Sequence, residues 1–143
     1  MKKIMLPLIL CIISFKAYAV DTTAYDACYK SAKDDDEVAL CMKAQTARVL
    51  KVIQEIYQNI AKHPDLAKWN NGTGLISGNL KDMYNHWVNY RNRYCSLYKV
   101  ANKNTFGSEN FHYERCLLSM TQRHYENIHS IIIDANTGGE EDD

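Results

Sequence analysis

Cysteine is the residue type in this chain whose chemistry is easiest to interpret, because number and spacing bear directly on disulfide formation. Cys11 lies inside an apolar N-terminal run, and the other four cysteines are Cys28, Cys41, Cys95 and Cys116. An even number of cysteines in an exported chain predicts that all of them are paired. We therefore expect two disulfides. Proximity in sequence favours Cys28–Cys41 and Cys95–Cys116, although helix topology leaves all three pairings open.

The N-terminal segment has the three parts of a secretory signal peptide. They are the basic start Lys2-Lys3, the apolar run over residues 4–15, and the cleavage motif Ala17-Tyr18-Ala19. A retained membrane anchor needs about 20 apolar residues, which this run does not reach. Lipidation of Cys11 would need a small residue where Leu10 stands. We expect a signal peptide over 1–19, cleaved after Ala19. The mature chain is then periplasmic or secreted, without stable insertion in the membrane.

The remaining reactive side chains do not form a catalytic pattern. A nucleophile elbow, a phosphate-binding loop and an HExxH motif are all missing from the sequence. The five histidines lack metal-ligand spacing; they are His63, His86, His112, His124 and His129. A zinc site that combines Cys95 and Cys116 with nearby histidines is the alternative use of these thiols, but oxidising surroundings favour disulfides. We therefore expect no enzyme, no cofactor and no bound metal.

Charge excludes one class of partner. The chain has 17 basic and 17 acidic residues, and the leader holds three of the basic ones and none of the acidic ones, so the remainder carries a net charge of −3. Four of the negative charges lie in the last four residues, Glu140 to Asp143. The body is close to neutral, which gives no electrostatic reason to expect a nucleic acid as partner.

Apolar residues at steps of three and four predict a helical protein. We expect a short helix over about 24–32, capped by Thr22 or Thr23, and a long helix over 34–63 that begins with the acidic run Asp34–Glu37. Negative charge at a helix start is favoured by the helix dipole. Turn residues fill 64–79. A second long helix covers 80–100, and Ser108 caps the third.

Each long helix carries one apolar stripe. The stripes are Val38, Met42, Thr46, Val49, Ile53, Ile56 and Ile60; Leu80, Met83, Trp87, Tyr90, Tyr94 and Leu97; and Leu118, Thr121, Tyr125, Ile128 and Ile132. Short connections require neighbouring helices to run antiparallel. The expected fold is an all-α, antiparallel three-helix bundle with a short N-terminal helix, stapled by disulfides. It forms one domain over 20–135, followed by a disordered acidic tail over 136–143.

Some aromatic and basic residues have two readings. Trp87, Tyr90 and Tyr94 have the spacing of core residues, whereas Trp69 lies in a loop outside any stripe. There it either anchors an interface or covers the open end of the bundle. Arg91 and Arg123 either form exposed salt bridges or brace the end of the bundle that carries the disulfides.

A set of short motifs stands in order along the chain. It comprises Cys28 with Cys41, Ile53-Gln54-Glu55-Ile56-Tyr57, the run from Trp87 through Arg91 to Cys95, Gly107-Ser108, Cys116, and Thr121 with Arg123. In this order the motifs resemble the LprI-type lysozyme-inhibitor family over nearly the whole mature chain. The chain departs from the family's pattern at three positions: Gln54 stands for Asn, Tyr84 for Gln, and Asn92 for Asp. The resemblance implies that Trp87, Arg91, Thr121 and Arg123 form a structural motif.

The resemblance also implies a binding function, with a lysozyme as the protein partner. A rigid bundle would place a loop in the lysozyme cleft, which contains a catalytic acid and a carboxylate. The linker 102–106 offers Lys103 as a cation and Phe106 as an apolar anchor, and the loop that carries Trp69 is its competitor. The alternative function is that of a periplasmic immunity or adaptor protein, which neutralises a toxin that attacks the cell wall.

Overall fold

The computed structural model describes residues 20–62 and 75–137, and regular structure within these ranges is entirely helical. The helices are α1 (Thr23–Ser31), α2 (Asp35–Lys62), α4 (Leu75–Ala101) and α5 (Glu109–Thr137). The expectation of an all-α protein is therefore confirmed. No helix of these two ranges combines the length and the apolar character needed to cross a membrane.

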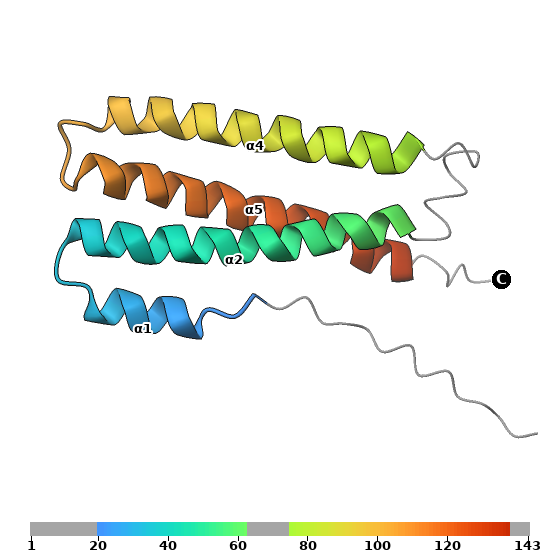
Figure 1. Cartoon of the computed structure of the whole chain (residues 1–143), viewed down its shortest axis with the longest axis horizontal. Coiled ribbons are helices and arrows are strands. Elements are labelled where there is room, and N and C mark those ends of the chain that lie inside the picture. The colour runs from blue at the N-terminus through green and yellow to red at the C-terminus, as the bar shows by residue number, and fades with distance from the viewer. Residues whose placement is uncertain (1–19, 63–74, 138–143) are drawn as a thin grey trace, which may run out of the picture.

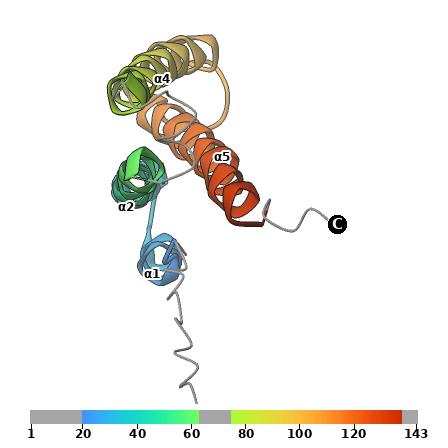
Figure 2. The same cartoon turned by 90° about the vertical axis from the view of Figure 1, so that its right-hand side faces the viewer.

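The three long helices lie side by side, and consecutive helices run in opposite directions, so that α2 and α5 run in the same direction (Figure 1). The largest interface is between α2 and α5, and α4 packs mainly against α5. The short helix α1 contacts α2 and lies on the side of α2 away from α4 (Figure 2). As a consequence α2 has helices on several sides, whereas α4 has neighbours on one side.

Acidic side chains begin the first two helices. The Asp34 carboxylate accepts a hydrogen bond from the Glu37 amide at 2.9 Å, and the Glu37 carboxylate accepts one from the Lys33 amide at 2.8 Å. The acidic run is thus a helix start, as predicted. For α1 the predicted cap is wrong in detail. Thr22 occupies the N-cap position without a side-chain cap bond, and the Asp21 carboxylate accepts the Thr23 amide instead, at 2.9 Å.

The core lies between α2 and α5. The predicted stripe of α2 is buried from Met42 to Ile60, and on α5 the side chains of Leu118, Thr121 and Ile128 are buried with it. Tyr84 and Trp87 of α4 also pack against this core. The stripes predicted for α2 and α5 are therefore confirmed.

The stripe predicted for α4 is wrong over most of its length. Its members Met83, Tyr90, Tyr94 and Leu97 are exposed. The inward face instead carries Tyr84, Trp87, Arg91, Cys95 and Tyr98. Both sets step by three and four. The sequence favours the outward set because that set is more apolar, whereas the inward set contains an arginine.

Two helix boundaries also differ from expectation. Helix α4 begins at Leu75 and so includes Gly78, which lies within the predicted turn region 64–79. One glycine inside a helix costs about 1 kcal/mol relative to alanine, which a helix of this length tolerates. Helix α5 continues through Asn136 and Thr137, placed in the tail by the sequence reading, up to the glycine at position 138. The predicted leader, Trp69 and residues 138–143 lie outside the described residues.

Candidate functional site

The two disulfides lie near the same end of the molecule. Cys28 pairs with Cys41 at a Cα–Cα distance of 5.7 Å, and Cys95 pairs with Cys116 at 5.5 Å. These are the pairs favoured by sequence proximity. The first joins α1 to α2 and the second joins α4 to α5, so each closes a pair of consecutive helices. Cys95 and Cys116 form a small buried cluster with Leu117.

The loop between α4 and α5 leaves from this end, and its backbone is well ordered by hydrogen bonds. The Asn102 side-chain amide donates to the Tyr98 carbonyl at 2.8 Å. The Thr105 amide and hydroxyl both donate to the Asn102 carbonyl, at 3.0 and 2.7 Å. On this loop Lys103 is exposed, and the Phe106 side chain is 93% exposed. The loop therefore presents a large apolar ring to solvent on a fixed backbone.

His112 of α5 supports the loop from below. Its Nε2 lies 3.0 Å from the Thr105 hydroxyl. That hydroxyl has one proton, which it donates to Asn102, so the histidine Nε2–H is the donor to Thr105. The histidine ring is buried, and its Nδ1 has no hydrogen-bond partner among the residues that the structure describes.

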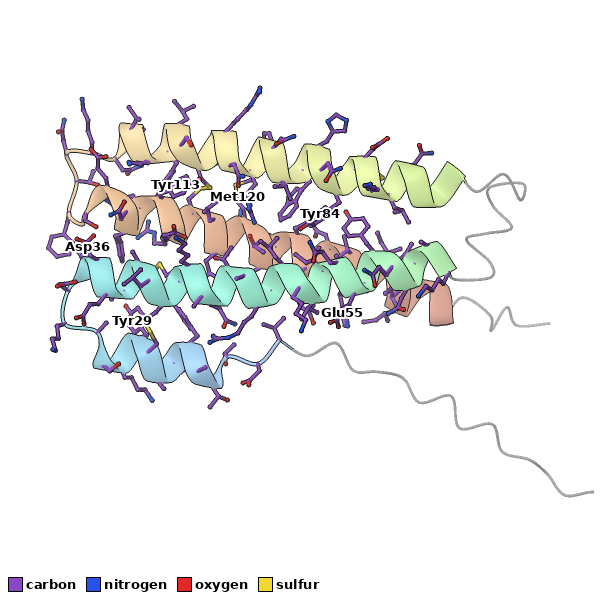
Figure 3. The ribbon with its side chains drawn as sticks, viewed as in Figure 1. Tyr29, Asp36, Glu55, Tyr84, Tyr113 and Met120 are labelled. Carbon is purple, nitrogen blue, oxygen red and sulfur yellow. A yellow bond between two sulfur atoms is a disulfide. The ribbon has the colours of Figure 1, made fainter. Side chains whose placement is uncertain are left out.

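Gly107 closes the loop in a conformation that other residues rarely adopt, with φ of 108°. A Cβ at this position would lie 3.0 Å from Phe111 and 3.3 Å from His112. The next residue, Ser108, caps α5 as predicted by accepting the Phe111 amide at 3.1 Å. Its hydroxyl also donates to the Asp36 carboxylate at 2.7 Å, which ties the loop to the start of α2 (Figure 3).

Arg91 is at the centre of the α4–α5 interface. Its guanidinium is buried and donates to the Thr121 hydroxyl at 2.9 Å, while Thr121 donates to the Leu117 carbonyl at 2.6 Å. The interpretation of Arg91 as an exposed salt bridge is therefore wrong. Its pKa is lowered by burial. The charge is retained because an arginine side chain stays protonated in proteins.

An aromatic stack continues from Arg91 toward α2. The Arg91 guanidinium lies 5.1 Å from the Trp87 ring centroid, and the Trp87 ring stacks on His124 at 3.9 Å. His124 shares a hydrogen bond of 3.0 Å with the Tyr57 hydroxyl. Burial, followed by the nearby charge of Arg91, lowers the pKa of His124 to about 4. Helical periodicity does not predict this stack of Trp87 on His124, because the two residues lie on different helices.

The three departures from the family's pattern have local explanations. The Gln54 side chain donates to the Tyr84 hydroxyl at 3.1 Å, so two of the three departures contact each other. The third, Asn92, accepts two bonds from the Arg91 guanidinium, at 3.1 and 2.9 Å, through its amide oxygen. Both bonds are therefore accepted by a neutral amide.

Arg123 differs from the other motif residues, because it is exposed and lines a groove between α4 and α5. No hydrogen bond or ion pair of its guanidinium is formed within the described residues. The structure therefore separates two motif arginines that have the same chemistry. One is a buried part of the helix interface and the other faces solvent.

Residues 20–62 and 75–137 contain no group of three side chains suited to hold a metal ion. The Glu114 carboxylate is half-buried, which raises its pKa, and its Oε2 has no hydrogen-bond partner among the described residues.

Fold and cross-links together define a small, disulfide-stapled helical protein with an exposed, hydrogen-bonded loop. The chain belongs to the LprI family, because the model of that family, described as Lysozyme inhibitor LprI, matches residues 26–127. The match begins just before the first disulfide and ends beyond Arg123, so it includes both disulfides and all of α2 and α4. This is a family of inhibitors and not of enzymes. No curated protein and no solved structure matches the chain.

Proposed function

We propose that this protein is a periplasmic or secreted inhibitor that occludes the cleft of a lysozyme with its α4–α5 loop. Residues 1–19 act as a cleaved signal peptide, and the helices of the mature chain form an antiparallel three-helix bundle that serves as the rigid scaffold. The family supports the class of partner. The proposal of a contact site is drawn from the loop itself.

One observation carries the choice of this loop: Phe106 is almost fully exposed on a backbone held by its own hydrogen bonds. A large ring kept in solvent costs free energy that binding can recover. Because the loop is already ordered, binding loses little conformational entropy. Lys103 lies three residues away and supplies a cation for the carboxylates of a lysozyme cleft.

Paired alanine substitutions test the proposal. The double variant Lys103→Ala, Phe106→Ala should weaken inhibition in a lysozyme turbidity assay by at least about thirtyfold, since loss of a hot spot costs about 2 kcal/mol or more. Its thermal stability should be unchanged, because both side chains are exposed. The matched control is Tyr29→Ala, Lys30→Ala on α1, which removes an exposed aromatic ring and an exposed lysine outside the loop.

Two results would redirect the proposal. Full inhibition by the loop variant would move the contact elsewhere, with Trp69 as the next residue to replace. If the wild-type protein inhibits none of a panel of lysozymes, cleft occlusion is discarded. The alternative of an immunity or adaptor protein against a toxin that attacks the cell wall would then be pursued by pull-down with such toxins.

A further inference from the structure

The outward face of α4 carries large apolar side chains that no other part of the described fold covers. Met83, Tyr90, Tyr94 and Leu97 are each about half exposed or more. They follow one another at steps of seven, four and three, which is the spacing of the contact seam in paired helices. From Met83 to Leu97 the stripe extends about 21 Å at 1.5 Å per residue. A helix of about four turns therefore matches its length.

This face adjoins a groove with α5. One hollow of about 360 Å³ is bordered by Tyr90 and Tyr94 on one side and by Met120, Arg123 and Asn127 on the other. A second hollow of about 550 Å³ continues from the same two tyrosines along α4 to Leu97 and Arg93. Met120, labelled in Figure 3 between α4 and α5, lines the first hollow and packs against the buried cluster of Cys95, Cys116 and Leu117. We call this continuous surface the tyrosine groove.

Charge in the tyrosine groove has one sign. Arg93 and Arg123 are exposed at its borders, and neither forms a hydrogen bond or an ion pair with another described residue. None of the described residues that line the groove is acidic. By contrast, partly buried Lys99 is paired with Glu109 at 3.1 Å. Two unpaired guanidiniums beside an apolar stripe favour a ligand that is both apolar and acidic.

We propose that the tyrosine groove binds an acidic amphipathic helix of a protein partner. The apolar side of that helix would pack on Tyr90, Tyr94 and Leu97, and its carboxylates would pair with Arg93 and Arg123. Recognition of a helix by an apolar groove with charged borders is a common mode of peptide binding. This surface runs along α4 and does not include Lys103 or Phe106, so the proposal goes beyond inhibition through the loop.

A second copy of the chain is a poorer occupant. Asp82 is the sole acidic residue in α4, and it stands beside Met83 at one end of the stripe. Antiparallel pairing of two α4 faces would therefore bring arginines of both copies together without carboxylates between them. Like charges opposed across an interface act against association.

Synthetic helices provide the probe. A fluorescein-labelled peptide of three heptads, with Leu at positions a and d and Glu at e and g, is titrated with the full mature protein and followed by anisotropy. The matched peptide has Lys at e and g. We expect the Glu peptide to bind at least about tenfold more tightly than the Lys peptide, and the difference to shrink at high salt.

Charge reversal then locates the site. Arg93→Glu, Arg123→Glu should weaken binding of the Glu peptide at least about tenfold, and Tyr90→Ser, Tyr94→Ser should also weaken it. The control Lys30→Glu, Lys51→Glu makes the same change in net charge on α1 and α2 and should leave binding unchanged. Unaltered circular dichroism melts show that each variant is folded.

Three outcomes overturn this inference: no binding of the Glu peptide, equal binding of the Lys peptide, or unchanged binding by the double arginine variant. Sedimentation of the wild type as a dimer that Tyr90→Ser, Tyr94→Ser dissociates would assign the groove to a second copy and overturn it as well. Inhibition of lysozyme by the arginine variant should stay at the wild-type level. A failure of this inference is thus distinct from a failure of the loop proposal.

Discussion

Helices α2 and α4 are nearly equal in length, at 28 and 27 residues, yet their apolar side chains have different surroundings. On α2 the apolar stripe is buried against α5, with α1 and α4 on other sides. On α4 the more apolar of two stripes is exposed, and the inward one is built around Arg91 and Cys95. Periodicity defines which residues share a helix face. The number of neighbouring helices decides whether that face is buried.

The largest effect is expected when a side chain at the centre of the buried α2 stripe is truncated. Ile53 is fully buried, so Ile53→Ala should lower the free energy of unfolding by about 2–5 kcal/mol, measured by urea denaturation. The control on the same helix is Leu40→Ala, because Leu40 is 65% exposed. A small effect at Ile53 would contradict the placement of the core between α2 and α5.

The next largest effect is expected on the inward face of α4. Arg91→Ala removes the hydrogen bond to Thr121 and the contact with Trp87, and should cost about 2–3 kcal/mol of unfolding free energy. Arg123→Ala should change stability by no more than about 0.5 kcal/mol, since Arg123 is exposed. Urea denaturation measures both effects. Equal losses of unfolding free energy in the two variants would contradict a buried Arg91 and an exposed Arg123.

A third prediction uses the stack beneath Trp87. The pKa of His124 is lowered to about 4 in the folded protein, against 6.5 for the free side chain. Between these values the unfolded chain binds a proton that the folded chain does not, so stability falls as pH is lowered from about 6.5 toward 4. Because the ring is half-buried, we expect a loss of about 1–2 kcal/mol. Stability at pH 7 should retain this contribution in full.

The variant His124→Phe keeps an aromatic ring between Trp87 and Tyr57 and has no titrating nitrogen. Its unfolding free energy, measured across the same pH range, should lack the step between 6.5 and 4. A step of unchanged size in this variant would assign the pH dependence to another group.

The smallest effect is expected on the outward face of α4. Leu97 is 68% exposed, so Leu97→Ala should alter the unfolding free energy by no more than about 0.5 kcal/mol, in spite of its place in a regular apolar stripe. Thermal melts of this variant and of Ile53→Ala form a matched pair from two stripes of similar spacing. A large loss at Leu97 would mean that another helix covers the stripe.

Local rules were sufficient for much of the fold. The stripes of α2 and α5, the cap at Ser108 and the acidic start of α2 follow from spacing and from helix-end chemistry, which depend on near neighbours in sequence. The favoured cysteine pairs also lie close together in sequence. Each of these features could be predicted because its cause is contained within a few helical turns.

The inward face of α4 and the tyrosine groove have causes that are not local. A buried arginine is read as a surface residue unless its partner is known, and the partner of Arg91 is Thr121, 30 residues away on α5. The stack of Trp87 on His124 and the groove beside Arg123 depend on how α4 and α5 are rotated about their axes. Helix periodicity alone does not determine how α4 and α5 are rotated.

The position of the disulfides has a consequence for native-state motion. Each bridge links consecutive helices, at sequence separations of 13 and 21, and neither crosses the α2–α5 interface. The molecule therefore consists of two covalently closed helical hairpins that meet along a noncovalent seam, secured by packing and by bonds such as that from Ser108 to Asp36. Separation along this seam leaves both hairpins closed. In hydrogen exchange, amides protected by the seam would open as one cooperative unit, at a lower free energy than complete unfolding.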